Sequence, residues 1–143
     1  MRYNELLQLY FERSNALQAY WTLYVVVLGG LLAVSSLNKQ PSLPTTLLVT
    51  ILYCLFAYKN LDAIRDTTLQ RAATLQLIKE SGASAAAEPN VNEVRKLLEP
   101  TLLPASDRSV RLTHVFSDLV TVAAFWAMEL RRGKDRRGAP SPI

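Results

Sequence analysis

The side chains whose types and spacing best suit acid–base or metal chemistry are His114 and Asp118. They are four residues apart, so a helix would place them on one face, together with Ser117 and Thr121. The pair could form an ion pair, a proton relay or half of a metal site. Zinc would need at least one more protein ligand, and none stands nearby at a suitable spacing. We therefore expect a polar helix face that contacts partner helices, with no metal, cofactor or catalytic role.

Signatures of enzymes are missing from the rest of the sequence. No P-loop, GxGxxG, HExxH or GxSxG pattern occurs. The paired hydroxyls at 35–36, 45–46 and 67–68 are far along the chain from the single histidine, so no base accompanies them. The single cysteine, Cys54, excludes an intrachain disulfide framework. We predict that the chain is not an enzyme.

The distribution of charge predicts the elements that carry these residues. No charged residue falls between Arg13 and Lys39, or between Lys39 and Lys59. Each uncharged block supplies the ~20 residues that a helix needs to cross the hydrocarbon of a bilayer. We predict an antiparallel pair of transmembrane helices in the first 61 residues, joined by a tight polar turn that contains Pro41 and Pro44.

Both helices are expected to continue beyond the membrane as amphipathic arms that pack together as a short antiparallel coiled coil. The predicted fold is an all-α membrane protein: a transmembrane hairpin with cytoplasmic helical extensions, followed by a third long helix. The expected segments are the hairpin with its arms (1–80), a linker with a short amphipathic helix (81–106), the third helix (107–132) and a basic disordered tail (133–143). Ser106 or Asp107 should cap the third helix.

Whether the third helix crosses the membrane is the hardest point. Its apolar run, 115–128, is about 14 residues long and contains Asp118, which favours an interfacial or re-entrant helix. Two crossings divide the basic residues 15 to 1 between the two sides, whereas three crossings divide them 10 to 6. Basic residues favour the cytoplasmic side, so we favour two crossings. The alternative is a third span with Asp118 facing the helix bundle.

Aromatic residues at one end of the hairpin predict its orientation. Tyr20, Trp21 and Tyr24 open the first span, while Tyr58 and Lys59 close the second. Such residues typically lie at a membrane interface, and here they adjoin the basic arms. We predict a cytoplasmic N-terminus in a bacterial inner membrane.

Two further patterns suggest partners. Small residues of the first span could let another helix approach closely, either the second span or another copy of the chain; they are Gly29, Gly30 and Ala33. Basic residues near the C-terminus could contact anionic lipid; they are Arg131, Arg132, Lys134, Arg136 and Arg137. Nucleic acid is not expected as a partner, because this tail has no aromatic residue to stack on bases.

These features favour a non-enzymatic scaffold or oligomerising subunit whose partners are the bilayer and either other copies or another protein. A second possibility is an oligomeric pore or an ion- or proton-conducting protein. In size, short turn and basic tail, the chain is similar in outline to phage holins, although neither predicted span of the hairpin has a polar stripe to line water. The third possibility is an accessory subunit of a membrane enzyme or transporter.

Overall fold

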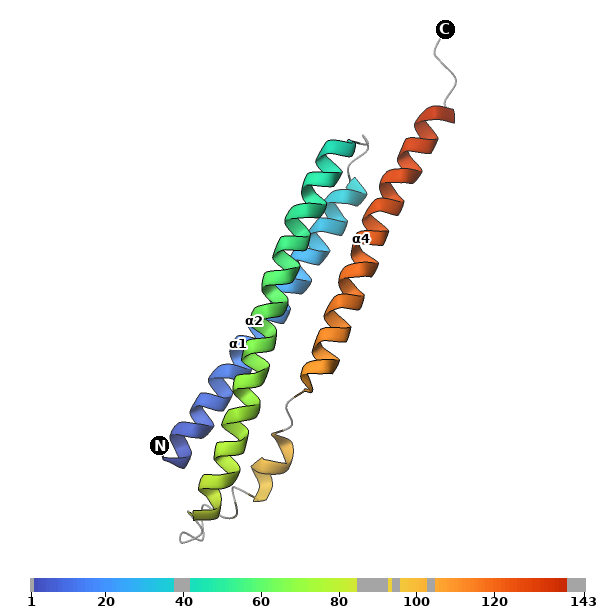
Figure 1. Cartoon of the computed structure of the whole chain (residues 1–143). Helices are drawn as coiled ribbons and strands as arrows, with labels where there is room; N and C mark the ends of the chain where they lie inside the picture. The colour runs from blue at the N-terminus through green and yellow to red at the C-terminus, as the bar shows by residue number, and fades with distance from the viewer. Residues whose placement is uncertain (1, 38–41, 85–92, 94–95, 103–104, 139–143) are drawn as a thin grey trace. The chain divides into compact units, whose positions relative to one another are not determined.

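The computed structural model describes residues 2–37, 42–84, 93, 96–102 and 105–138. Helices dominate these residues, and no strand occurs among them. The principal elements in Figure 1 are helices α1 (Tyr3–Leu37) and α2 (Leu43–Ser84), the 3₁₀ turn η1 (Glu99–Thr101) and helix α4 (Asp107–Gly138). The predicted all-α fold is therefore confirmed, with three long helices.

Helices α1 and α2 are each continuous over an apolar block and a charged arm, as predicted. The arm precedes the apolar block in α1 and follows it in α2. They contain 35 and 42 residues. Helix α2 starts immediately after the turn: the Thr46 amide donates to the Ser42 carbonyl at 2.9 Å. Pro44 lies in this first turn, where its missing N–H breaks no helical hydrogen bond. Helix α2 ends at Ser84, slightly beyond the expected limit at residue 80.

Helix α4 begins as predicted and ends later than predicted. The Ser109 amide donates to Ser106 Oγ at 3.2 Å, so Ser106 is the N-cap. The helix continues to Gly138, so residues 133–138, expected to be part of a disordered tail, are helical instead. Lys and Arg are good helix formers and favour the negative end of the helix dipole, which accounts for the extension.

The short amphipathic helix expected within the linker 81–106 lies largely outside the described residues. Residues 93 and 96–98 are helical, and η1 follows them. The Leu97 side chain is 75% exposed, and Leu98 is half-buried.

The chain divides into two compact units, each described here by itself. Unit 1 contains Met1–Trp21 and Asp62–Arg111, which include the arms of α1 and α2. Its apolar core consists of two clusters, formed by Leu6, Tyr10, Leu75, Ile78 and Leu102 and by Leu17, Ile64 and Val110. The arms therefore pack together through the apolar stripes that the sequence predicts.

Polar contacts add to the packing of the arms. Arg71 of α2 donates to the hydroxyl of Tyr10 at 2.9 Å, and its guanidinium lies 5.0 Å from the centre of the same ring. Arg65 and Asp107 form an ion pair at 3.4 Å. Because the Arg65 side chain is 48% exposed, this ion pair contributes little to stability.

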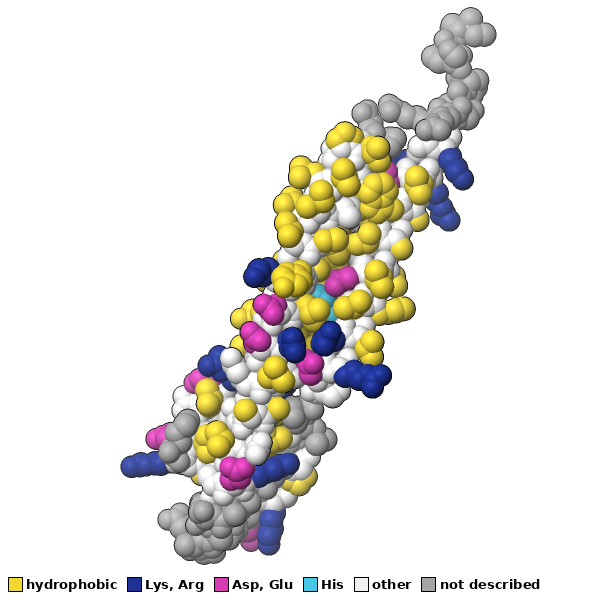
Figure 2. All heavy atoms as spheres, in the orientation of Figure 1, with side chains coloured by type: hydrophobic (Ala, Val, Ile, Leu, Met, Phe, Trp, Pro, Cys, Tyr) yellow, Lys and Arg dark blue, Asp and Glu magenta, His cyan; other side chains and the backbone are white. Residues whose placement is uncertain are grey.

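Unit 2 contains Thr22–Leu61 and Leu112–Ile143, and its polarity is inverted. Of the large hydrophobic side chains that are exposed in the described part of the chain, 18 lie in unit 2 and four in unit 1. Six polar or charged side chains are buried in unit 2: Ser35, Thr46, Asn60, His114, Thr121 and Glu129. Figure 2 shows hydrophobic side chains gathered on the visible face where α1, α2 and α4 form this unit. Compared with unit 1, unit 2 thus exposes more apolar side chains and buries more polar ones, although it also buries Tyr24, Tyr53, Ala57 and Phe125.

Two helices are long and apolar enough to cross a membrane. The candidate segments are Tyr3–Leu37, with a mean hydropathy of 1.7 in its most apolar window, and Leu43–Ser81, with 1.5. Only 11% and 22% of these windows are buried. The core helix of a water-soluble protein would hide most of such a window, so these two helices do not fit that explanation.

Candidate functional site

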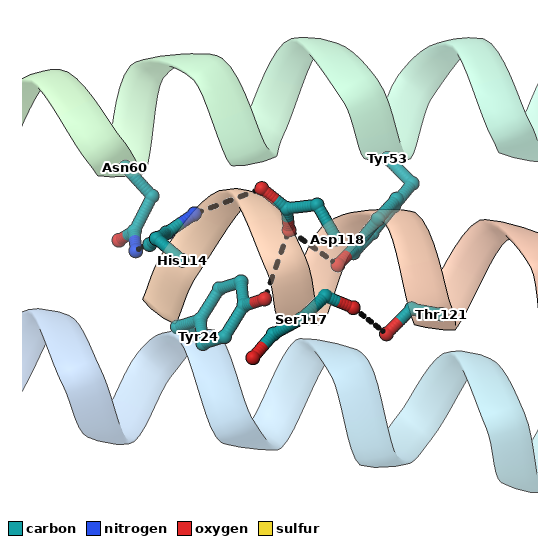
Figure 3. A network of polar contacts seen from close by, with 7 residues as sticks. All are labelled: Tyr24, Tyr53, Asn60, His114, Ser117, Asp118 and Thr121. Carbon is teal, nitrogen blue, oxygen red and sulfur yellow. Dashed lines mark hydrogen bonds and ion pairs between the residues drawn. The ribbon is translucent and has the colours of Figure 1, made fainter. Parts of the chain in front are cut away.

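The most concentrated group of buried polar side chains in unit 2 surrounds Asp118 on α4 (Figure 3). The Tyr24 hydroxyl of α1 donates to Asp118 Oδ1 at 2.9 Å, and the Tyr53 hydroxyl of α2 donates to the same oxygen at 2.8 Å. His114 Nδ1 lies 2.8 Å from Asp118 Oδ2. One carboxylate therefore joins side chains from all three long helices.

His114 is the most deeply buried member of this group, with 0% exposure. Its ring centre lies 4.2 Å from that of Tyr24, and its Nε2 lies 3.3 Å from Asn60 Nδ2. An amide nitrogen can only donate, so His114 Nε2 accepts and the proton of a neutral ring resides on Nδ1. His114 then donates to Asp118.

The other two residues of the predicted polar face contribute less directly. The Thr121 hydroxyl is buried and donates to the Ser117 carbonyl of its own helix at 2.8 Å. Ser117 itself is half-buried. The structure thus brings His114 and Asp118 into one network, and both side chains contact residues of α1 or α2.

The chemistry of the network is that of a connector between helices. A carboxylate has about four lone-pair positions, and three around Asp118 are filled by the two tyrosines and His114. No group of three or more His, Cys, Asp or Glu side chains suited to a metal ion occurs among the described residues. The arrangement supplies hydrogen bonds that hold α4 against α1 and α2.

A second polar contact lies further along unit 2, and the sequence analysis missed it. Arg132 donates to the Ser35 carbonyl of α1 and lies 3.9 Å from Glu129, whose side chain is 10% exposed. A cavity of about 60 Å³ adjoins these groups, with Thr45 and Thr46 of α2 also in its wall. The spacing of Glu129 and Arg132, at i and i+3, was the available signal.

Three members of the Asp118 network also escaped the sequence analysis: Tyr53, Asn60 and, in this role, Tyr24. Tyr24 was expected at the membrane interface, but it is 3% exposed and faces Asp118, so that assignment is wrong. Its hydroxyl finds an acceptor inside the unit. The available signal for such network residues was a polar residue near the end of an apolar block, and Asn60, next to Lys59, is an example.

The remaining predicted interface residues lie in different settings. Tyr58 is 66% exposed, and the Lys59 ammonium lies 5.9 Å from its ring centre. Tyr20 and Trp21 are half-buried and pack against the second cluster of unit 1. Tyr58 and Lys59 are thus available to an interface, and Tyr20 and Trp21 also serve the core.

The small residues of α1 make no close helix contact in the structure. Gly29, Gly30 and Ala33 are exposed, and a Cβ built at either glycine would meet nothing within 4 Å. Packing against the second span, one of the two predicted alternatives, is therefore wrong for the glycines. Contact with another copy of the chain stays a prediction.

The basic residues at the end of α4 divide into two kinds. Arg131 and Lys134 are exposed, as contact with lipid headgroups requires. Arg132 instead points its guanidinium at Ser35 and Glu129. The side chains of Arg136 and Arg137 lie outside the described residues, so their predicted contact with anionic lipid stays a prediction.

The search for relatives gives no further guide to the site. No protein-family model, curated protein or solved structure matches this chain.

Proposed function

We propose that this chain is an integral membrane protein with three spans and a non-enzymatic role as a scaffold or assembly subunit. The observation that carries the proposal is the inverted polarity of unit 2. In water, 18 exposed large hydrophobic side chains around a polar interior would be strongly unfavourable. In hydrocarbon the same arrangement is favourable, because the polar groups around Asp118 find hydrogen-bond partners inside the protein.

The orientation of the side chains on α4 supports a third span. Between residues 112 and 130 its exposed large side chains are all apolar: Leu112, Val115, Phe116, Leu119, Val120 and Leu130. Asp118 and Glu129 point into the unit, so they do not interrupt this outer surface. The span then extends from residue 112 to residue 130, about 28 Å of helix at ~1.5 Å per residue, close to the ~30 Å of a bilayer core.

This proposal departs from the two crossings favoured by the basic residues. Three crossings leave 10 basic residues on the N-terminal side and six on the other, so the bias still favours a cytoplasmic N-terminus. The burial of the polar face of α4 is stronger evidence than the distribution of basic residues. An interfacial helix would turn that face to water, whereas here His114 and Thr121 are buried.

A scaffold agrees better with the geometry than a pore. The polar face of α4 is the surface that a pore would need as its lining, and it is occupied by Tyr24, Tyr53 and Asn60 of the same chain. Hydrogen bonds between these groups hold the helices together and leave α4 with an apolar outer surface. A role in assembling other membrane proteins follows from a rigid bundle with large apolar surfaces.

Reporters fused after Glu88 and after Ile143 test the three spans. We expect the Glu88 reporter in the cytoplasm and the Ile143 reporter on the opposite side. If both are cytoplasmic, α4 does not cross and the three-span arrangement is refuted.

Vesicles that contain the purified protein test the scaffold role against conduction. We expect proton and ion leakage equal to that of protein-free vesicles, for both the natural chain and the Asp118→Asn variant. Leakage that disappears in Asp118→Asn would contradict the scaffold proposal and favour conduction through the network.

A further inference from the structure

A groove between α2 and α4 in unit 2 opens directly onto Asp118. It has a volume of about 320 Å³. Helix α2 contributes Tyr53, Cys54 and Ala57 to its wall, and α4 contributes Asp118, Leu119 and Val122. Tyr58 and Leu61 of α2 also line it, and the wall is apolar apart from the Asp118 carboxylate and the two tyrosine hydroxyls. In the three-span arrangement this groove would face the bilayer.

Asp118 is not fully enclosed by its own chain. Its side chain is 21% exposed, and three of its roughly four acceptor positions are filled. Asp118 Oδ1 accepts hydrogen bonds from both tyrosines. Asp118 Oδ2 contacts only His114, so it can accept one more hydrogen bond. A partly exposed carboxylate next to hydrocarbon is costly unless a cation lies against it.

We propose that this groove receives a transmembrane helix of a partner protein, and that one Lys or Arg side chain of that helix binds Asp118. This inference rests on the proposed three-span function and specifies how such a scaffold would recognise its partner. The apolar wall would take the body of the helix, and the carboxylate would select for the basic residue. Charge complementarity inside the bilayer gives specificity, because a helix without the cation leaves the exposed part of the Asp118 carboxylate against hydrocarbon.

A second copy of this chain fits the groove less well. Residues 14–38, 40–58 and 112–130 contain no Lys or Arg, so the apolar segments of another copy offer no cation. Lys59, the basic residue at the end of the second apolar block, already has its ammonium over the ring of Tyr58 in its own chain. Lipid acyl chains are uncharged. The occupant is therefore a different protein.

The depth of Asp118 predicts where the partner's basic residue should be. Asp118 is seven residues, about two helical turns, beyond the charged Arg111, or about 10 Å along the helix at ~1.5 Å per residue. A Lys or Arg at about that depth can reach the carboxylate with its long side chain.

The test uses two synthetic helices of roughly 20 Leu and Ala residues, the length of one span. One carries a single Lys about 10 Å from its end, and the other carries Leu at that position. Each peptide bears a coumarin acceptor, and energy transfer from Trp21 and Trp126 of the full-length protein in lipid vesicles measures association. We expect the Lys peptide to bind at least about tenfold more tightly than the Leu peptide, and Asp118→Asn to remove that preference.

A second pair of variants leaves Asp118 in place. Cys54→Phe fills the groove without adding a tryptophan donor and should weaken binding of the Lys peptide, whereas Leu55→Phe, at a neighbouring exposed position outside the groove wall, should not. Equal binding of the two peptides, or a preference that survives both Asp118→Asn and Cys54→Phe, would overturn the proposal. Self-association that requires Lys59 and Asp118 would overturn it too, by assigning the groove to a second copy.

The topology reporters separate this failure from failure of the proposed function. If the Ile143 reporter lies opposite the Glu88 reporter and the Lys peptide shows no preference, the groove proposal alone is refuted. If both reporters are cytoplasmic, the three-span arrangement itself fails.

Discussion

Replacement of Asp118 by Leu removes the centre of the polar network while keeping a side chain of similar size. The tyrosine hydroxyls of α1 and α2 then lose the acceptor that joins them to α4. A hydrogen bond between membrane helices contributes about 0.6 kcal/mol on average and about 1.7 kcal/mol at most. Loss of two such bonds predicts a decrease of about 1–3 kcal/mol in the free energy of unfolding.

The assay is a denaturant titration of the protein in detergent micelles, followed by tryptophan fluorescence and circular dichroism. Ser117→Ala is the matched control, because Ser117 lies on the same helix face and is half-buried. We expect that control to stay within about 0.5 kcal/mol of the natural chain. The Asp118→Leu variant should lose α4 packing at lower denaturant.

A double-mutant cycle with Tyr53→Phe isolates the tyrosine contact. Tyr53→Phe should cost about 0.6 kcal/mol in the natural chain and almost nothing in the Asp118→Leu background. Apolar residues can replace a buried charge in some proteins without loss of stability, so the Asp118→Leu experiment has two physically possible outcomes. An Asp118→Leu protein as stable as the natural chain would refute our view that the network holds α4 in place.

Three further substitutions test the packing described above by the same titration. Ile78→Ala creates a cavity at a fully buried position between the arms and should lower the free energy of unfolding by about 2–5 kcal/mol. Leu77→Ala, at an exposed position, should lower it by less than about 1 kcal/mol. Equal losses would contradict the assigned core. Ser106→Ala removes the cap of α4 and should cost about 1 kcal/mol, with Ser109→Ala, which keeps the donating amide, as its control; no loss in Ser106→Ala would show that the cap is unimportant. Gly29→Ala should leave stability equal or higher, because nothing lies within 4 Å of the added Cβ; a clear loss would reveal a contact with another copy.

The sequence predicts the long helices and the core of the arms well, because both depend on local periodicity. Ile64 and Ile78 recur on one face of α2 within a charged segment, and the structure buries both completely. Ser106 predicts the start of α4 because a cap acts on the amides directly after it. Such signals lie within a few residues of the features that they specify.

The Asp118 network could be predicted only in part, for a physical reason. Periodicity shows that His114 and Asp118 share a face, but it does not show whether that face meets water or other helices. A tyrosine at the start of a span suits an interface equally well, so Tyr24 could not be assigned to the interior from its position alone. The same ambiguity made Asp118 appear to interrupt an apolar run, whereas its inward orientation lets the outer surface of α4 continue past it.

The inward orientation of the polar residues of α4 has a consequence for how the protein is made. An isolated helix with Asp118 inside its span inserts poorly, because an Asp costs as much as about 2.5–3.5 kcal/mol at the centre of a span. In the arrangement proposed here, α1 and α2 leave the ribosome first and already carry Tyr24, Tyr53 and Asn60, the groups that α4 needs. The hairpin would thus act as a template for insertion of the third helix, and a chain that lacks residues 1–61 would leave α4 outside the bilayer.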